Sequence, residues 1–361
     1  MIHICYGLHD KDGRYSKFTG ASIVSIFENS TAPPRFIAVH ILHDNTLSQE
    51  NRDKFNQIAG RYGQIIKFYN VEEICPDKIE EIKKAMSKAE MFERFSIGTS
   101  FRLLMADVLE EDIEKVIYLD SDIIVNMDVN ELWQIDMENK PLASVSSWDL
   151  GLNHVDFYRE HYLATSGILG YKEYFCSAFL VADLNYWRSH KEKILESINF
   201  VAENTNCNYF DQDVLNYWLA KNYVHLDEKF DVFVVFERRD EIKRSKLRPA
   251  IYHYVSQSLG LNTQDIFNRL WFKYFSKTPW FDEEIFSHIY EGVQQIYIWQ
   301  KNFLTQVSAI QANKSRAFFV ASQNIPAVKQ IFAVKESEEI IELVSDESIQ
   351  NLIQSIKKSS L

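Results

Sequence analysis

Two aspartates one residue apart, Asp120 and Asp122, follow a mostly apolar run that begins at Lys115. The run Lys115-Val-Ile-Tyr-Leu119 predicts a buried strand, and Ile123-Ile-Val125 continues the apolar pattern after the pair. Magnesium-like cations usually take one or two carboxylates plus substrate oxygens, so this pair could share a cation with the phosphates of a nucleotide. The alternative is an acidic turn. Apolar flanks favour the cation, because carboxylates are rarely buried without a partner.

Other side chains could complete such a site. His253 follows an apolar run, and an imidazole with carboxylates suits manganese better than calcium, although a lone histidine is more often structural. Asp211-Gln212-Asp213 opens a predicted helix, where the acids could equally cap the helix. Arg102 lies on an otherwise apolar helix and could be a surface arginine. Tyr6 and Tyr15 flank the first turn and could stack on a base or belong to the core.

Alternating strands and helices would position these residues. Strands are predicted at 2–6, 35–42, 63–69, 116–119, 175–184, 232–236 and 250–255, and helices at 18–27, 49–59, 100–109 and 211–220. The alternation in the first 125 residues predicts parallel pairing in a doubly wound α/β sheet. Ligands of such sheets bind beyond the carboxyl ends of the strands, where Asp120-Ser-Asp122 and the turn Gly7–Gly13 both fall.

Composition excludes several classes of protein. The chain has 361 residues and a net charge of −12, which argues against a nucleic-acid partner because phosphate binding needs a basic surface. Its four cysteines are scattered without a C-x-x-C pair, so neither a zinc site nor a disulfide framework is indicated. There is no signal-peptide pattern and no apolar run of the roughly 20 residues that span a membrane. We therefore expect a cytoplasmic protein without a transmembrane segment.

Taken together, these segments resemble the family 8 retaining glycosyltransferases, which have a GT-A fold and use nucleotide-activated sugars. Tyr118-Leu-Asp-Ser-Asp122 resembles the family's Y-L-D-x-D metal motif, and Phe210-Asp-Gln-Asp-Val-Leu-Asn216 resembles its D-Q-D-x-L-N motif. Phe175–Trp187 resembles the F-N-(S/A)-G segment with its L-x-x-W end, and Ile251-Tyr-His-Tyr254 resembles the metal-histidine segment. The resemblance implies a GT-A domain, an α/β fold with a mostly parallel central sheet and flanking helices.

The resemblance also implies the chemistry. Asp120, Asp122 and His253 would bind Mn²⁺ (or Mg²⁺) and, through it, the diphosphate of a UDP-sugar, UDP-glucose or UDP-galactose. Asp211 would bind hydroxyls of the donor sugar, and Gln212 would lie beside the anomeric carbon. The reaction would transfer a hexose, with retention of configuration, to a hydroxyl of a glycan acceptor.

Six further residues would contact the donor. Tyr6, Asp10 and Tyr15 would hold the uridine, and Arg102 would contact the donor sugar or its phosphates, where a planar cation suits oxyanions. The predicted donor-binding residues are Tyr6, Asp10, Tyr15, Arg102, Ser121 and Asp213.

Two segments depart from the family pattern and leave the donor sugar open. Cys176-Ser-Ala178 stands where members usually have Asn, a small residue and Gly, and Leu259 stands where the lysine of G-P-x-K-P-W is expected. One alternative is a weakly active nucleotide-sugar-binding partner or scaffold subunit of another glycosyltransferase. Another is a metal-dependent nucleotidyltransferase or phosphohydrolase, since these enzymes also use paired carboxylates.

Three regions are predicted. Residues 1–275 would form the GT-A domain, 276–312 a helical connector, and 313–361 a small α/β add-on unit. The last unit resembles an add-on behind such domains in enzymes that extend glycans on bacterial serine-rich surface adhesins. This likeness implies a glycoprotein acceptor, in which the sugar is added to a protein-linked glycan.

Overall fold

The structure is a computed structural model, and the chain divides into two compact units, Met1–Phe281 and Asp282–Leu361. The described residues are 1–147 (except 91, 93 and 94), 163, 166–170, 172–204, 207, 209–237, 246–255, 265–281, 298, 299, 301 and 302. The predicted connector (276–312) lies mostly outside these residues, and the add-on unit (313–361) and Leu259 lie wholly outside them. Those three expectations stay predictions.

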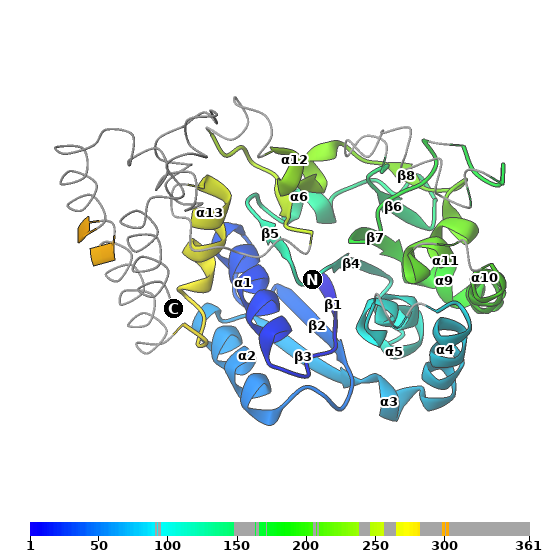
Figure 1. Cartoon of the computed structure of the whole chain (residues 1–361), viewed down its shortest axis with the longest axis horizontal. Coiled ribbons are helices and arrows are strands. Elements are labelled where there is room, and N and C mark those ends of the chain that lie inside the picture. The colour runs from blue at the N-terminus through cyan, green and yellow to red at the C-terminus, as the bar shows by residue number, and fades with distance from the viewer. Residues whose placement is uncertain are drawn as a thin grey trace, which may run out of the picture. The chain divides into compact units, whose positions relative to one another are not determined.

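The first unit is built on a seven-stranded sheet with the order β3-β2-β1-β4-β7-β6-β8 (Figure 1). Its strands are β1 (Ile2–Leu8), β2 (Ile37–His43), β3 (Ile65–Asn70), β4 (Lys115–Leu119), β6 (Leu142–Ser144), β7 (Phe179–Asp183) and β8 (Val224–His225). β1 pairs in parallel with β2 and β4, and β2 with β3, as predicted. The half of the α/β sheet that is formed by β3, β2, β1 and β4 is therefore parallel.

β7 lies beyond the first 125 residues, for which parallel pairing was predicted. It runs antiparallel to both β4 and β6, with Leu119 opposite Phe179. Its first residue therefore lies at the carboxyl end of β4, and the Asp120 amide donates a hydrogen bond to the Ala178 carbonyl over 2.9 Å. The strand predicted from residue 175 begins only at 179, and the residues before it bond the segment that follows β6, with the Cys176 amide donating to the Val145 carbonyl over 3.1 Å. This brings the Cys176-Ser-Ala178 segment beside the Asp120 carboxylate.

Helices cover the sheet. They are α1 (Arg14–Asn29), α2 (Gln49–Tyr62), α3 (Val71–Ile74), α4 (Pro76–Lys88), α5 (Met105–Val108), α6 (Asn130–Trp133), α9 (Leu184–Ser189), α10 (Lys191–Glu203), α11 (Phe210–Leu219), α12 (Val234–Glu237) and α13 (Ile266–Phe275). α1 packs against α2 and α13, while α10 packs against α4 and α11 (Figure 1). The helix predicted at 100–109 is a 3-10 helix, η2 (Ile97–Leu104), followed by α5. A second short 3-10 helix is η3 (Glu228–Phe230).

A second, three-stranded sheet has the order β5-β10-β9. β10 (Ile251–His253) runs antiparallel to β5 (Ile123–Val125) and parallel to β9 (Val232–Phe233), and α12 replaces the rest of the strand predicted at 232–236. His253 is paired with Ile123, and the Tyr254 amide donates to the Asp122 carbonyl over 3.0 Å. This pairing brings a histidine from late in the chain next to Asp122.

Gly20 allows α1 to pack closely against Trp280. A Cβ at Gly20 would overlap the indole ring, whereas a Cβ at Gly60 of α2 would meet no heavy atom within 4 Å. We expect Gly20→Ala to lower the free energy of unfolding by about 1–3 kcal/mol through overpacking. Gly60→Ala should raise it by up to about 1 kcal/mol, because Ala favours the helix. Urea denaturation measures both, and equal stability of the two variants would contradict the packing described.

Candidate active site

A cavity of about 480 Å³ opens at the carboxyl ends of β1 and β4. Eight of the eleven predicted site residues line it: Tyr15, Arg102, Asp120, Ser121, Asp122, Asp211, Gln212 and His253. They come from α1, η2, the β4–β5 connection, α11 and β10, which are far apart in the sequence. The fold therefore assembles most of the predicted set at the edge where open α/β sheets bind their ligands.

Asp120, Asp122 and His253 form a candidate metal-binding cluster. One ligand atom from each lies within 4.8 Å of the other two, and His253 Nε2 is 3.5 Å from Asp122 Oδ1. Although burial alone would lower the pKa of His253, the carboxylates of Asp122 and Asp231 raise it well above its ordinary value. Two carboxylates and one imidazole are a donor set that fits Mn²⁺, and Mg²⁺ through the carboxylates. The residues present therefore fit the predicted cation.

Arg102 connects this cluster to α11. Its Nη2 lies 2.7 Å from Asp120 Oδ1 and its Nε lies 3.1 Å from Asp211 Oδ2, and the side chain is buried. Burial and the Asp122 carboxylate raise the pKa of Asp120 to about 6, although the Arg102 guanidinium opposes that rise. The surface-arginine interpretation is therefore wrong. Arg102 lines the cavity, but its donors serve the protein's own carboxylates.

The segment Cys176-Ser-Ala178 fixes the start of α11. The Ser177 amide donates to Gln212 Oε1 over 2.9 Å, and the Ser177 carbonyl accepts from Arg102 Nη1 over 2.5 Å. The Ser177 hydroxyl lies 3.1 Å from Asp211 Oδ2. Gln212 Nε2 donates to the hydroxyl of Tyr174 over 2.9 Å. The amide of Gln212 is thus held at both ends while its residue lines the cavity.

Three predicted donor-binding residues do not line the cavity. Tyr6 is completely buried under α1 and bonds the Ser22 hydroxyl over 2.8 Å, because β1 side chains alternate and Tyr6 shares the inner face with Ile4. Asp10 accepts from the Tyr15 amide over 2.9 Å and from the Ser16 hydroxyl, both in the first turn of α1. Asp213 is completely buried and accepts from the Tyr174 hydroxyl over 2.7 Å. These three side chains bond other groups of the protein, and their predicted contact with the donor stays a prediction.

Sequence reasoning missed several lining residues. His9, in the predicted turn, lines the cavity and its Nδ1 is 2.5 Å from Asp44 Oδ2. Ser177 stands at the small position of the family's F-N-(S/A)-G segment, where no role was predicted for it, and its contacts depend on the antiparallel direction of β7. Phe95 and Tyr209 also line the cavity, with ring centroids 6.0 Å apart, and no local signal marked them.

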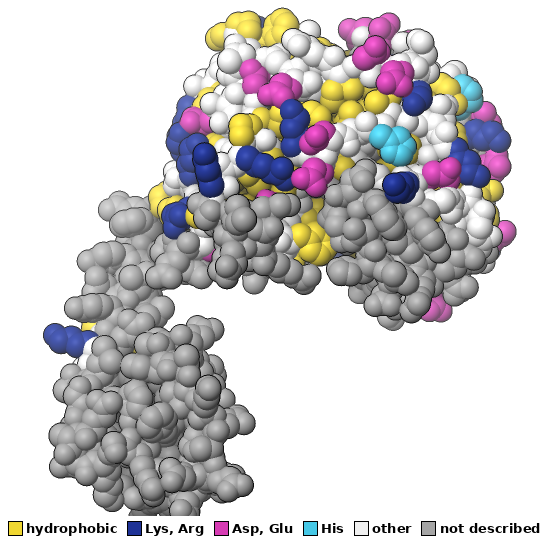
Figure 2. Space-filling view, turned by 90° about the horizontal axis from the view of Figure 1, so that it is seen from above, with side chains coloured by type: hydrophobic (Ala, Val, Ile, Leu, Met, Phe, Trp, Pro, Cys, Tyr) yellow, Lys and Arg dark blue, Asp and Glu magenta, His cyan; other side chains and the backbone are white. Residues whose placement is uncertain are grey.

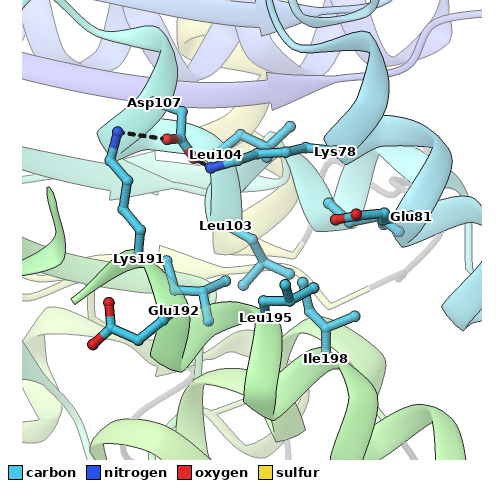
Figure 3. Close-up of a pocket in the computed structure, with 11 residues that line it drawn as sticks. Lys78, Glu81, Leu103, Leu104, Asp107, Lys191, Glu192, Leu195 and Ile198 are labelled. Carbon is cyan, nitrogen blue, oxygen red and sulfur yellow. Dashed lines mark hydrogen bonds and ion pairs between the residues drawn. The ribbon is translucent and has the colours of Figure 1, made fainter.

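A second pocket, of about 250 Å³, lies between α4, α5 and α10 (Figure 3). Asp107 at its mouth pairs with both lysines that point toward it, Lys78 at 2.5 Å and Lys191 at 2.8 Å. Leu103, Leu104 and other aliphatic side chains form much of the wall, and Glu81 and Glu192 also line it. The pocket thus combines one ion-pair cluster with an apolar wall, and none of the predicted site residues lines it.

The distribution of surface charges agrees with the net charge of −12, from which no basic surface is expected. On the described part of the face in Figure 2, Lys and Arg side chains stand among Asp and Glu and form no continuous basic area. No helix among the described residues is long and apolar enough to cross a membrane.

Comparison with known proteins decides the family. The sequence model of "Glycosyl transferase family 8" matches residues 4–258, which include every site residue described above. The chain belongs to this family. A Haemophilus influenzae protein named "Putative glycosyltransferase" is 31% identical over 242 residues, a match that covers 66% of each chain. A Salmonella typhimurium lipopolysaccharide 1,3-galactosyltransferase is 25% identical over 263 residues, which cover 70% of this chain and 71% of the relative.

Solved structures establish the fold of this family 8 member. The crystal structure of the galactosyltransferase LgtC with donor and acceptor sugar analogs superposes with a TM-score of 0.61 at 19% identity. The superposition covers 79% of this chain and 98% of LgtC. The first unit therefore has the GT-A fold, and the predicted family and fold class are confirmed.

Proposed function

We propose that this protein is a retaining hexosyltransferase that moves glucose or galactose from a UDP-sugar to a hydroxyl of a glycan, with Mn²⁺ or Mg²⁺. One observation carries the proposal: Asp120, Asp122 and His253 converge within 4.8 Å at the wall of a cavity that Gln212 also lines. Membership of family 8 and the galactosyltransferases among the similar proteins support it.

Each residue of the candidate site would have its own role in the reaction. Asp120, Asp122 and His253 would hold the cation, and Arg102 keeps the Asp120 carboxylate in place. When bound, the cation would supply Lewis-acid stabilisation of the negative charge on the departing diphosphate. The donor sugar lies toward Asp211 and Gln212, and Tyr15, 41% exposed, offers a ring to the uracil. The acceptor hydroxyl attacks the anomeric carbon as UDP leaves.

Retention of configuration is explained by attack on the face from which the diphosphate leaves. The double-displacement route needs a carboxylate nucleophile about 5 Å from its acid partner. Gln212 carries an amide, which is a poor nucleophile and is held by Ser177 and Tyr174. We therefore infer that Gln212 stabilises positive charge at the anomeric centre, and that a phosphate oxygen of the leaving UDP takes the proton of the acceptor hydroxyl.

A donor screen tests the proposed function. UDP-glucose, UDP-galactose and their N-acetyl forms are incubated with the protein and Mn²⁺, and released UDP is measured. One UDP-hexose should release UDP, and chelation of Mn²⁺ should stop the release. No turnover with any donor would support a scaffold subunit, and release of phosphate or pyrophosphate instead of UDP would support a phosphohydrolase or nucleotidyltransferase.

Gln212 tests the mechanism. We expect Gln212→Ala to lower transfer by about 10²-fold, comparable to the loss of one charge-stabilising group, while UDP binding is retained. Gln49→Ala, on the exposed face of α2, should leave the rate unchanged. Intact-protein mass spectrometry should find no sugar adduct. Complete loss of transfer with an adduct trapped on a neighbouring residue would contradict the single-face route.

Tyr15 and Tyr6 form a matched pair for donor binding. Tyr15→Ala should raise the KM for the UDP-sugar roughly 10-fold, because stacking of a base on an aromatic ring is worth about 1–3 kcal/mol. Tyr6→Phe should leave KM unchanged and cost about 1 kcal/mol of stability, because it removes only the buried hydrogen bond to Ser22. A raised KM for Tyr6→Phe with an unchanged KM for Tyr15→Ala, measured by steady-state kinetics, would indicate that Tyr6 contacts the donor.

The acceptor and the compartment are also proposals. We favour a protein-linked glycan in the cytoplasm, because the C-terminal residues resemble the add-on unit of adhesin-glycosylating enzymes and the four cysteines are unpaired. The similarity to a lipopolysaccharide galactosyltransferase favours a lipid-linked glycan instead. Transfer of labelled sugar to a glycosylated protein, compared with transfer to a lipid-linked oligosaccharide, separates the two.

A further inference from the structure

A completely buried carboxylate, Asp231, lies behind His253. Asp231 directly precedes β9, and β9 pairs in parallel with β10, where His253 lies opposite Phe233. Asp231 Oδ1 is 3.0 Å from His253 Nδ1, while His253 Nε2, the other ring nitrogen, is 3.5 Å from Asp122 Oδ1. The imidazole therefore stands between a carboxylate inside the protein and a carboxylate at the cavity wall.

The contacts around the ring leave it little freedom. The Phe233 ring packs edge-on against His253, with centroids 4.9 Å apart and planes at 87°. Asp231 is 0% exposed and His253 is 6% exposed. Among the described residues, Asp231 Oδ2 has no hydrogen-bond partner, so the contact to His253 Nδ1 is the side-chain hydrogen bond that Asp231 makes. Burial of a carboxylate with so few partners is costly, and that cost points to a role for this contact.

We propose that Asp231 is a positioning residue that fixes the tautomer and orientation of His253 for cation binding. A carboxylate can only accept a hydrogen bond, so it keeps a ring proton on Nδ1, and Nε2, beside Asp122, is the nitrogen that gives up its proton and binds when a cation enters. Carboxylates behind a metal-ligating histidine act in this way, and losing one typically costs 10–100-fold in metal affinity. The inference rests on the proposed function, because it assumes that the cluster binds a cation.

A competing arrangement uses the same residues. The ligand atoms of Cys176, Asp231 and His253 also lie within 4.8 Å of one another, so Asp231 would in that case bind the cation itself. The two arrangements differ in one respect. A positioning residue acts only through His253, whereas a ligand contributes whether or not His253 is present.

Asp231→Asn is the informative variant, because it keeps the size of the side chain. Its amide can donate to Nδ1 and thereby place the ring proton on Nε2, which then cannot bind a cation. We expect the Kd for Mn²⁺, measured by electron paramagnetic resonance with and without UDP, to rise 10–100-fold. The ¹⁴N modulation of an imidazole ligand in the spin echo of bound Mn²⁺ should weaken. Asp227→Asn, which changes an exposed carboxylate that caps η3 in the β8–β9 connection, should change neither.

A double-mutant cycle then separates the two arrangements. In the His253→Ala background, adding Asp231→Asn should change the Kd for Mn²⁺ by less than about 2-fold, because Asp231 has nothing left to position. A further large loss of affinity would overturn the proposal in favour of direct ligation. Should His253→Ala fail to fold, the single variant still decides: unchanged affinity with unchanged ¹⁴N modulation overturns the proposal.

The outcome is distinguishable from failure of the proposed function. Wild-type protein that binds Mn²⁺ through an imidazole but transfers no sugar would contradict the transferase proposal and leave the role of Asp231 intact. Wild-type protein that binds no Mn²⁺, with or without UDP, would overturn the metal site and the role of Asp231 together.

Discussion

Asp122→Asn should lower metal-dependent sugar transfer by about 10²–10³-fold while leaving the protein folded. Asn keeps the shape of the side chain but removes the negative charge that faces His253 Nε2 across 3.5 Å. The carboxylate is one of two in the candidate metal cluster, so its loss should weaken the hold on the cation that neutralises the leaving diphosphate. Initial rates of UDP release at several Mn²⁺ concentrations measure the effect, and excess Mn²⁺ should restore part of the rate.

Asp128→Asn is the matched control. Asp128 lies six residues further along the chain, accepts hydrogen bonds from Thr31 and Asn130 at the start of α6, and does not line the cavity. Asp128→Asn should lower the free energy of unfolding by about 1 kcal/mol, as the loss of a cap does. It should leave the Mn²⁺ dependence of transfer unchanged. Equal activity of the two variants would remove Asp122 from the metal site.

The residues of the candidate metal cluster could be predicted because the signal of each one is local. Asp120 and Asp122 end an apolar strand, and His253 ends another, so their burial and the edge on which they lie follow from hydrophobic patterning and from the parallel pairing of β1 and β4. Their approach to one another required the antiparallel pairing of β5 and β10, which patterning alone does not give.

The supporting residues could not be separated from the contacting residues in the same way. Asp213 belongs to the segment that resembles the family's D-Q-D-x-L-N motif, whereas Tyr6 and Asp10 lie in the first strand and the turn after it. The side on which each lies depends on alternation along β1 and on the first turns of α1 and α11. Asp231 carried no signal, because its meaning arises only when β9 pairs with β10. The sequence thus predicted which segments carry site residues, whereas strand pairing and side-chain direction decided which of those residues reach the cavity.

Arg102 should prove the most sensitive residue for fold and activity together. Its guanidinium joins Asp120, after β4, to Asp211, at the start of α11, and bonds the Ser177 carbonyl between them. Removing one partner of a buried ion pair costs about 3–5 kcal/mol, because the other charges stay buried without compensation. We expect that loss for Arg102→Leu in denaturant unfolding, with transfer lowered by at least about 10²-fold as Asp120 and Asp211 lose their alignment.

Arg102→Lys distinguishes charge from geometry. A lysine keeps the positive charge but cannot reach two carboxylates and a carbonyl with a planar fork, so it should recover part of the stability and little of the activity. Arg188→Lys is the control, because Arg188 bonds backbone carbonyls from Ala106 to Ile113 and no site carboxylate. It should lose stability without losing activity per folded molecule. Full activity of Arg102→Lys would mean that charge alone holds the site, and the shared alignment of Asp120 and Asp211 by one guanidinium would then be wrong.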